Sequence, residues 1–179
     1  MQSLWDFAGD IYQHEPVKAQ CLYLQQTAGV DVCLLLTMVW AGRGGCRMDA
    51  DLLSELHTLS SPWQAQLLMP LRDVRIAMGP AQGSATVDIE PEQREAIYQQ
   101  LKALELDIEY RQLTQLQQCF FVRNLLEADL AMPPVDAALQ AIIGDNVQLY
   151  LQSLNAQPQR ELDQPTIARA AALFCEFLL

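Results

Sequence analysis

The sequence predicts an all-α fold, a single domain of residues 1–179 built as a bundle of seven or eight helices. Apolar residues recur at spacings of three and four along successive segments, and residues typical of helix starts and ends separate those segments. No segment has the sustained alternation of apolar and polar residues that marks a half-buried β-strand. Hydrophobic residues make up 51% of the chain, which is enough for a sizeable core.

The first two helices are expected over residues 4–14 and 16–28. Ser3, followed by Asp6 three positions later, is an acidic variant of the capping box that starts many helices. A proline suits the first turn of the second helix, because the N–H that it lacks would be unpaired there. Gly29 is typical of the residue that follows a helix end.

The most apolar stretch, GVDVCLLLTMVWAGRGG at residues 29–45, predicts the central helix of the bundle, at about 31–42. Asp31 is its expected N-cap. Apolar residues cover opposite sides of this helix, so neighbouring helices should pack around it. The uncharged run between Asp31 and Arg43 is too short for a membrane span, which needs about 20 residues.

Beyond the central helix, residues 48–59 and 60–78 predict two further helices. Ser61 should cap the second of them, and Pro70 should kink or split it, because proline cannot donate the backbone hydrogen bond that a helix interior needs. Residues 79–91 collect glycine, proline and serine without helical spacing, and they predict a hinge loop.

The rest of the chain predicts long helical segments. No glycine or proline occurs from residue 92 to about 130, which permits one long helix or two. Two more helices are expected at about 133–154 and 164–179, each with a proline near its start. The last one ends in ALFCEFLL, an apolar end that should dock on its own core or on another copy of the chain.

Charge and cysteine content exclude several classes of protein. The chain has 22 acidic and 11 basic residues, a net charge of −11, whereas nucleic acids and anionic membrane surfaces are bound by clustered lysine and arginine. We therefore expect neither as a partner. Five cysteines without a Cys-x-x-Cys pair predict reduced thiols and a cytoplasmic location. The acidic start of the chain lacks the basic region of a signal peptide.

The stretch LWDFAGDIYQHEPVKAQCLYLQQTAGVDVCLLLTMVWAG, residues 4–42, resembles a family of short proteobacterial proteins that share a domain of unknown function. The resemblance is carried by Leu4-Trp5, Phe7-Ala8, Tyr12, Val17, Cys21-Leu22, Leu24-Gln25, Gly29, Asp31-Val32, Leu34-Leu35-Leu36 and Trp40. It continues more loosely through Trp63 and residues 70–72 into residues 101–113. It implies a cytoplasmic, all-α bacterial protein, and it brings no activity or catalytic residue.

Arginines near a glycine-rich segment form the first candidate site. Arg43 and Arg47 are the two ends of the sequence RGGCR, which leads into the helix expected at residue 48. Guanidinium groups and free backbone N–H groups at a helix start bind anions. Arg72 and Arg75 could add to this anion or ligand site, although Arg43 and Arg47 could instead pair with neighbouring aspartates. The flanking charges should also lower the pKa of the Cys46 thiol.

Two acidic pairs form the second candidate site. Asp6 and Asp10 are four residues apart, as are Glu105 and Glu109, so each pair lies on one helix face. If the two pairs face each other, they could bind Mg²⁺, which prefers carboxylate oxygens. The alternative is that both pairs are solvated, so our main expectation is a protein without a cofactor.

The leading interpretation is a protein-interaction module rather than an enzyme. The acidic part of the long helix, Glu105, Asp107 and Glu109, should bind a protein partner, and its charge suits a basic one, unless it is only a solvated face. The apolar C-terminal helix could make a homo-oligomer. The alternative is a small-molecule-binding protein or a metal-dependent enzyme acting on an anionic, phosphorylated ligand. No P-loop, Rossmann or hydrolase motif supports an enzyme.

Overall fold

The computed structural model describes residues 2–79, 89–126, 134–155 and 162–178. Its elements are α1 (Leu4–Tyr12), α2 (Glu15–Ala28), α3 (Val32–Arg43), α4 (Ala50–Pro62), the π-helical segment η1 (Trp63–Leu68), α5 (Met69–Met78), α6 (Pro91–Val122), α7 (Ala137–Leu154) and α8 (Gln164–Glu176). Because α4, η1 and α5 follow one another without a break, these ranges contain seven helical rods and no strand. The all-α prediction is therefore confirmed. Most of the predicted hinge loop, residues 80–88, lies outside the described ranges.

The helix ends in the first third follow the expected chemistry. The Ser3 hydroxyl accepts a hydrogen bond from the backbone N–H of Asp6, at 3.1 Å, and starts α1. The Asp31 carboxylate accepts one from the N–H of Leu34, at 3.2 Å, and starts α3. Gly29 ends α2 with φ of 60°, a left-handed conformation that costs a glycine little. These three predicted caps are confirmed.

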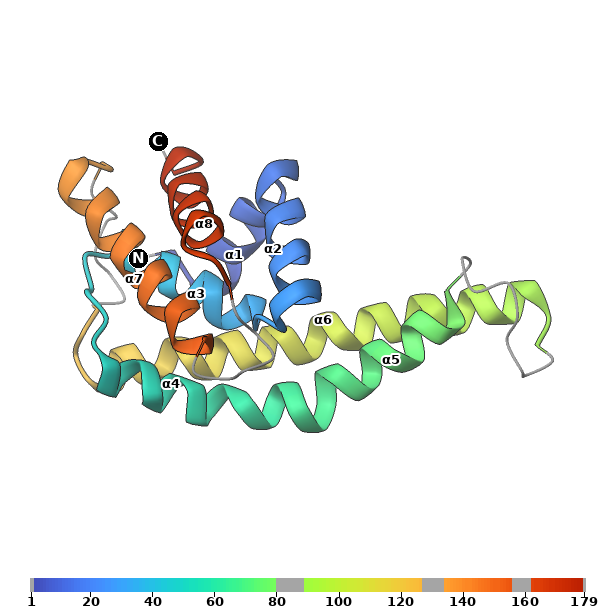
Figure 1. Cartoon of the computed structure of the whole chain (residues 1–179). Coiled ribbons are helices and arrows are strands. Elements are labelled where there is room, and N and C mark those ends of the chain that lie inside the picture. The colour runs from blue at the N-terminus through green and yellow to red at the C-terminus, as the bar shows by residue number, and fades with distance from the viewer. Residues whose placement is uncertain (1, 80–88, 127–133, 156–161, 179) are drawn as a thin grey trace.

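Helix α3 is the central helix of the bundle, as predicted. All ten residues from Cys33 to Gly42 are buried, and α1, α6 and α7 pack around them. Figure 1 shows α3 enclosed by these helices. The closest approach is to α7, where a Cβ atom added to Gly42 would lie 2.8 Å from the Cα atom of Ile143. A side chain at this position would push the two helices apart.

Helix α7 also holds the segment that joins α3 to α4. The buried Asn146 side chain accepts a hydrogen bond from the N–H of Met48, at 2.8 Å, and donates to the carbonyls of Cys46 and Met38. One turn along α7, the Tyr150 hydroxyl accepts from the N–H of Asp31, at 2.9 Å. These side chains satisfy backbone groups that would otherwise be buried without partners.

The run from α4 to α5 corrects one prediction. No helix starts at Ser61, because α4 continues through Pro62 and widens into the π-helical turns of η1. In these turns the N–H of Met69 bonds to the carbonyl of Gln64, five residues back. Proline lacks an N–H and crowds the preceding turn, and a wider turn accommodates both effects. The rod bends between the stretches labelled α4 and α5 (Figure 1).

Residues 91–122 form one helix, α6, about 48 Å long at 1.5 Å per residue. Its second half packs on the bundle, while its first half runs beside α5 and projects away from the bundle (Figure 1). We call α5 together with residues 91–110 of α6 the arm. Helix α8 packs on α7 and buries its apolar stripe within the chain. None of the described helices is long and apolar enough to cross a membrane.

Candidate functional site

The arm is held together by ion pairs at its base. Arg75 Nε lies 2.5 Å from Glu105 Oε1, and Arg72 Nη2 lies 2.6 Å from Glu109 Oε1. Arg72 Nε also lies 3.7 Å from Glu105 Oε2, so two arginines of α5 face two glutamates of α6. The higher-numbered arginine meets the lower-numbered glutamate, which shows that the two helices run antiparallel. The structure thus brings four sequence-predicted residues together.

These charges are largely removed from water. The side chains of Arg72 and Glu105 are 16% and 10% exposed. Burial raises the pKa of Glu109, and the charge of Arg72 lowers it by less than burial raises it. The hydrogen bond to Glu105 raises the pKa of Arg75. Such groups are tolerated inside a protein only when they are paired, which is how this cluster is built.

A second polar network joins the arm to the centre of the bundle. The Gln112 amide donates to Asp31 Oδ2, at 2.8 Å, and to the Ser60 hydroxyl, at 2.7 Å. Ser60 donates to the same Asp31 carboxylate. Gln64, in η1, donates to Gln112 at 3.2 Å and accepts from Arg72 at 3.4 Å. Loss of solvent raises the pKa of Asp31, against the lowering effect of its hydrogen bonds.

The outer surface of the arm is rich in apolar side chains. No residue of α5 is buried, and the first buried residue of α6 is Glu105. Six large apolar side chains of the arm are exposed instead: Met69, Val74, Ile76, Leu104, Leu106 and Tyr110. We call these six residues the apolar arm surface. The arm therefore encloses ion pairs between its two helices and leaves these six apolar side chains exposed.

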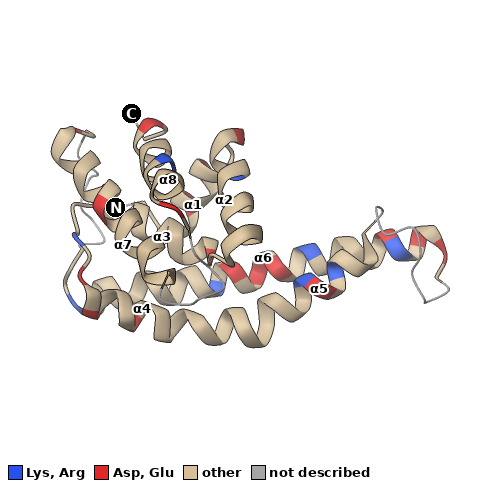
Figure 2. Cartoon of the chain, in the orientation of Figure 1, with Lys and Arg blue, Asp and Glu red and all other residues tan. Residues whose placement is uncertain are grey.

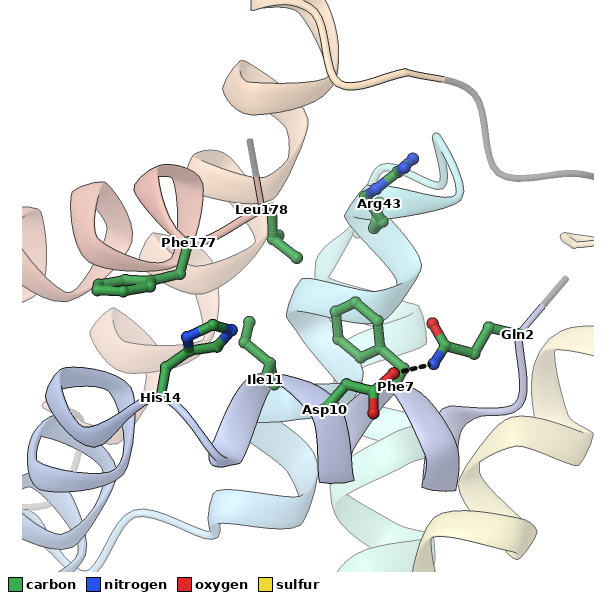
Figure 3. Close-up of a pocket in the computed structure, with 8 residues that line it drawn as sticks. All are labelled: Gln2, Phe7, Asp10, Ile11, His14, Arg43, Phe177 and Leu178. Atoms are coloured by element: carbon green, nitrogen blue, oxygen red, sulfur yellow. Dashed lines mark hydrogen bonds between the residues drawn. The ribbon is translucent and has the colours of Figure 1, made fainter.

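A pocket of about 280 Å³ lies elsewhere, between the ends of α1, α3 and α8 (Figure 3). Phe7 and Ile11 of α1 line it together with Phe177, which follows α8. Its polar side chains include Arg43, the last residue of α3, and Asp10.

The four arginines of the predicted anion site do not gather in one place. Arg43 lines the pocket, Arg72 and Arg75 lie in the arm, and Arg47 forms an exposed ion pair with Asp145 of α7. The expectation for Cys46 is wrong, because burial and the charge of Asp49 raise the pKa of its thiol. The side chains of the adjacent arginines interact with other groups: Arg47 pairs with Asp145, and Arg43 lines the pocket.

The carboxylates of the predicted metal site each interact with a partner of their own. Asp6 accepts a hydrogen bond from the Ser3 hydroxyl at 2.6 Å, and Asp10 accepts one from the Gln2 amide at 2.6 Å. Glu105 and Glu109 face arginines instead. No group of three or more His, Cys, Asp or Glu side chains in the described ranges could hold a metal ion.

The predicted acidic face is divided in the structure. Asp107 is exposed and pairs with Arg111 on the same helix, at 3.0 Å, whereas Glu105 and Glu109 point to α5. Figure 2 shows residues of both charges along the arm. The spacing placed Glu105 and Glu109 on one helix face, but it did not show that this face contacts α5.

Sequence reasoning missed the network around Asp31, apart from the cap itself. Ser60 and Gln64 are ordinary polar residues of one continuous rod and Gln112 lies on α6, and no spacing rule brings Gln112 or Asp31 to them. A glutamine next to apolar residues at helical spacing, such as Gln112 beside Leu113 and Leu116, is a signal that could have pointed to it.

The model of the family described as Protein of unknown function (DUF2390) matches residues 3–116, more than half of the chain. The matched region includes the ion pairs of the arm, the Asp31 network and Arg43, while Phe177 lies beyond it. Comparison with curated proteins gave no match, and comparison with solved structures gave none.

Proposed function

We propose that this chain, which belongs to the DUF2390 family of proteins of unknown function, is a protein-interaction module whose arm binds a partner protein. One observation carries the proposal: large apolar side chains lie on the outside of the arm, while the inside holds charges. Helices in proteins gain most of their stability by packing an apolar face. The arm has six such side chains that stay exposed, of which Tyr110 also contacts the Trp5 ring of α1.

Charge supports the choice of partner. The chain carries a net charge of −11, which favours association with a basic surface and disfavours an acidic one. The partner proposed here is a protein that presents an apolar helical face with lysine or arginine at its rim. The five free cysteines fit a reducing compartment, which supports the cytoplasm as the location proposed for this interaction.

The proposal can be tested by site-specific photo-crosslinking in living cells. A photoreactive amino acid replaces Val74, which is 48% exposed on the arm, or Tyr23, which is 50% exposed on α2 and serves as the matched control. We expect a discrete adduct from position 74 and not from position 23. The adduct should disappear when Ile76→Glu is added, without a change in the melting temperature.

Two results would contradict the proposal. Identical adducts from both positions would mean that any exposed residue reacts, and an adduct that survives Ile76→Glu would mean that the apolar arm surface does not bind. An adduct of twice the chain mass would identify the partner as a second copy. That result would retain the module and overturn the basic partner.

A further inference from the structure

The ion pair between Arg75 and Glu105 divides the apolar arm surface into two flanks. Arg75 Nε lies 2.5 Å from Glu105 Oε1, so both side chains point into the contact between α5 and α6. On an α-helix, the residues just before and just after an inward-pointing residue are turned by about 100° to opposite sides of it. The residues in these positions are all apolar and about half exposed: Val74 at 48%, Ile76 at 51%, Leu104 at 48% and Leu106 at 54%.

The antiparallel direction of the two helices decides which of these residues share a flank. Two facing antiparallel helices are related by a two-fold axis normal to the plane that contains them. The residues that precede the paired positions therefore lie on one side of that plane, and the residues that follow them lie on the other. Val74 and Leu104 form the first flank, and Ile76 and Leu106 form the second. Met69, seven residues before Ile76 and so on the same helix face, extends the second flank.

The width of the arm separates the two flanks. A helix with its side chains is about 10 Å wide, and the ion pairs fill the space between α5 and α6. A single helix of a partner can therefore cover one flank, while the other stays in water. A second copy of the chain related by two-fold symmetry uses the same surface on both copies, so it also covers one flank only.

Charge at the edge of the second flank favours a basic partner. Asp73 lies one turn after Met69 on the same face of α5. It is exposed, and none of the ion pairs among the described residues includes it. Its carboxylate is available to a lysine or arginine of the partner, and the net charge of −11 acts in the same direction.

We propose that the partner of the arm is a basic protein that contributes two helices, one on each flank, so that α5 and α6 become the middle pair of a four-helix bundle. This inference rests on the proposed function and adds the form of the partner to it. Each partner helix packs an apolar stripe against both α5 and α6, as amphipathic helices do in apolar grooves. The ion pairs remain at the centre, and a basic residue beside one stripe meets Asp73.

Photo-crosslinking at two nearby positions of α6 tests this arrangement in living cells. The photoreactive amino acid replaces Leu104, on the first flank, or Leu106, on the second. Asp107, on the face of α6 turned away from α5, is the control position. We expect adducts with one and the same protein from positions 104 and 106 and none from position 107. Peptide mapping of the adducts should place the two crosslinks in two separate segments of that protein.

The remaining outcomes of this experiment each contradict the two-helix arrangement. An adduct from only one of the two flanks, the same partner segment at both, two different proteins or an adduct of twice the chain mass would overturn it. Adducts from Val74 and Leu104 without one from Leu106 would leave the proposed function standing. The absence of adducts from all three positions would contradict the proposed function as well.

A substitution tests whether one protein covers both flanks at once. Leu106→Glu, on the second flank, should lower the adduct yield from position 74, on the first flank, by at least about tenfold, because the two helices of one partner bind together. Leu22→Glu, at a 38% exposed position of α2, is the matched control and should leave that yield unchanged. Neither change should alter the melting temperature, since both side chains are exposed. An unchanged yield with Leu106→Glu would show that the flanks bind independently and would refute the proposal.

Discussion

The Nη2 atom of Arg72 lies 2.6 Å from Oε1 of Glu109, and this contact joins α5 to α6 where an apolar contact would be usual. Together with the pair of Arg75 and Glu105, this ion pair determines which residues of the two antiparallel helices lie opposite each other. Buried charges add little net stability, yet they exclude arrangements that leave a charge unpaired. The apolar residues of the arm remain outside, where a partner can reach them.

The first prediction concerns this ion pair. Arg72→Met should lower the free energy of unfolding by about 3 kcal/mol, because it leaves the Glu109 carboxylate partly buried without its counter-charge. Adding Glu109→Leu should recover most of the loss, since two apolar groups then face each other. Urea unfolding of the single and double variants measures both effects.

Arg111→Met, which breaks the exposed pair with Asp107, is the control and should not change stability measurably. A double variant no more stable than Arg72→Met would contradict the explanation.

The sequence predicts those features of the fold that depend on contacts between residues close in the sequence, such as helix caps. Asp31 and Gly29 act on adjacent backbone groups, so their roles follow from local spacing. Ser61 and Pro62 also form a local pattern, but the prediction fails there because α4 continues through both residues into η1. A local signal for a helix start is thus not sufficient to start one.

The candidate site shows the same limit. The spacing of Glu105 and Glu109 correctly places them on one helix face, but their pairing with Arg72 and Arg75 depends on α5 packing antiparallel against α6, which no spacing within either helix shows. Asn146 is equally hidden in the sequence, because its partners are backbone groups of a distant connection. The spacing of residues shows which of them share a helix face, and only the packed structure shows which residues that face contacts.

The second prediction is a pH dependence. Burial raises the pKa values of Asp31 and Glu109, so the folded chain binds protons at pH values where the unfolded chain has released them. The free energy of unfolding should therefore fall as pH rises through the window above the ordinary carboxyl pKa of about 4. The stability that these groups contribute is fully present below that value and is lost as pH approaches the raised pKa.

Two substitutions distinguish the titration of Asp31 from the effect of removing any one negative charge. Asp31→Asn should reduce the slope of unfolding free energy at pH values above the ordinary carboxyl pKa of about 4, because the titrating group is gone. Asp136→Asn removes one charge from another helix N-cap, which is exposed, and should keep the slope. Guanidinium chloride unfolding across this range measures the slopes, since its high ionic strength screens the surface charges. Equal slopes for the unmodified chain and Asp31→Asn would show that Asp31 does not titrate there.

The third prediction concerns the contact between α3 and α7. Gly42→Ala places a Cβ atom 2.8 Å from the Cα of Ile143, and because that atom belongs to a backbone, it cannot rotate away. The helices must separate, and the free energy of unfolding should fall by about 1–3 kcal/mol.

Gly9→Ala is the matched control: its Cβ meets nothing within 4 Å, and it lies in the exposed part of α1. There alanine should raise stability by about 0.5–1 kcal/mol, because glycine loses more backbone freedom on folding. Thermal unfolding followed by circular dichroism measures both changes, which should have opposite signs. A neutral Gly42→Ala would mean that α3 and α7 are not held at this distance, and the central position of α3 would then rest on its other neighbours.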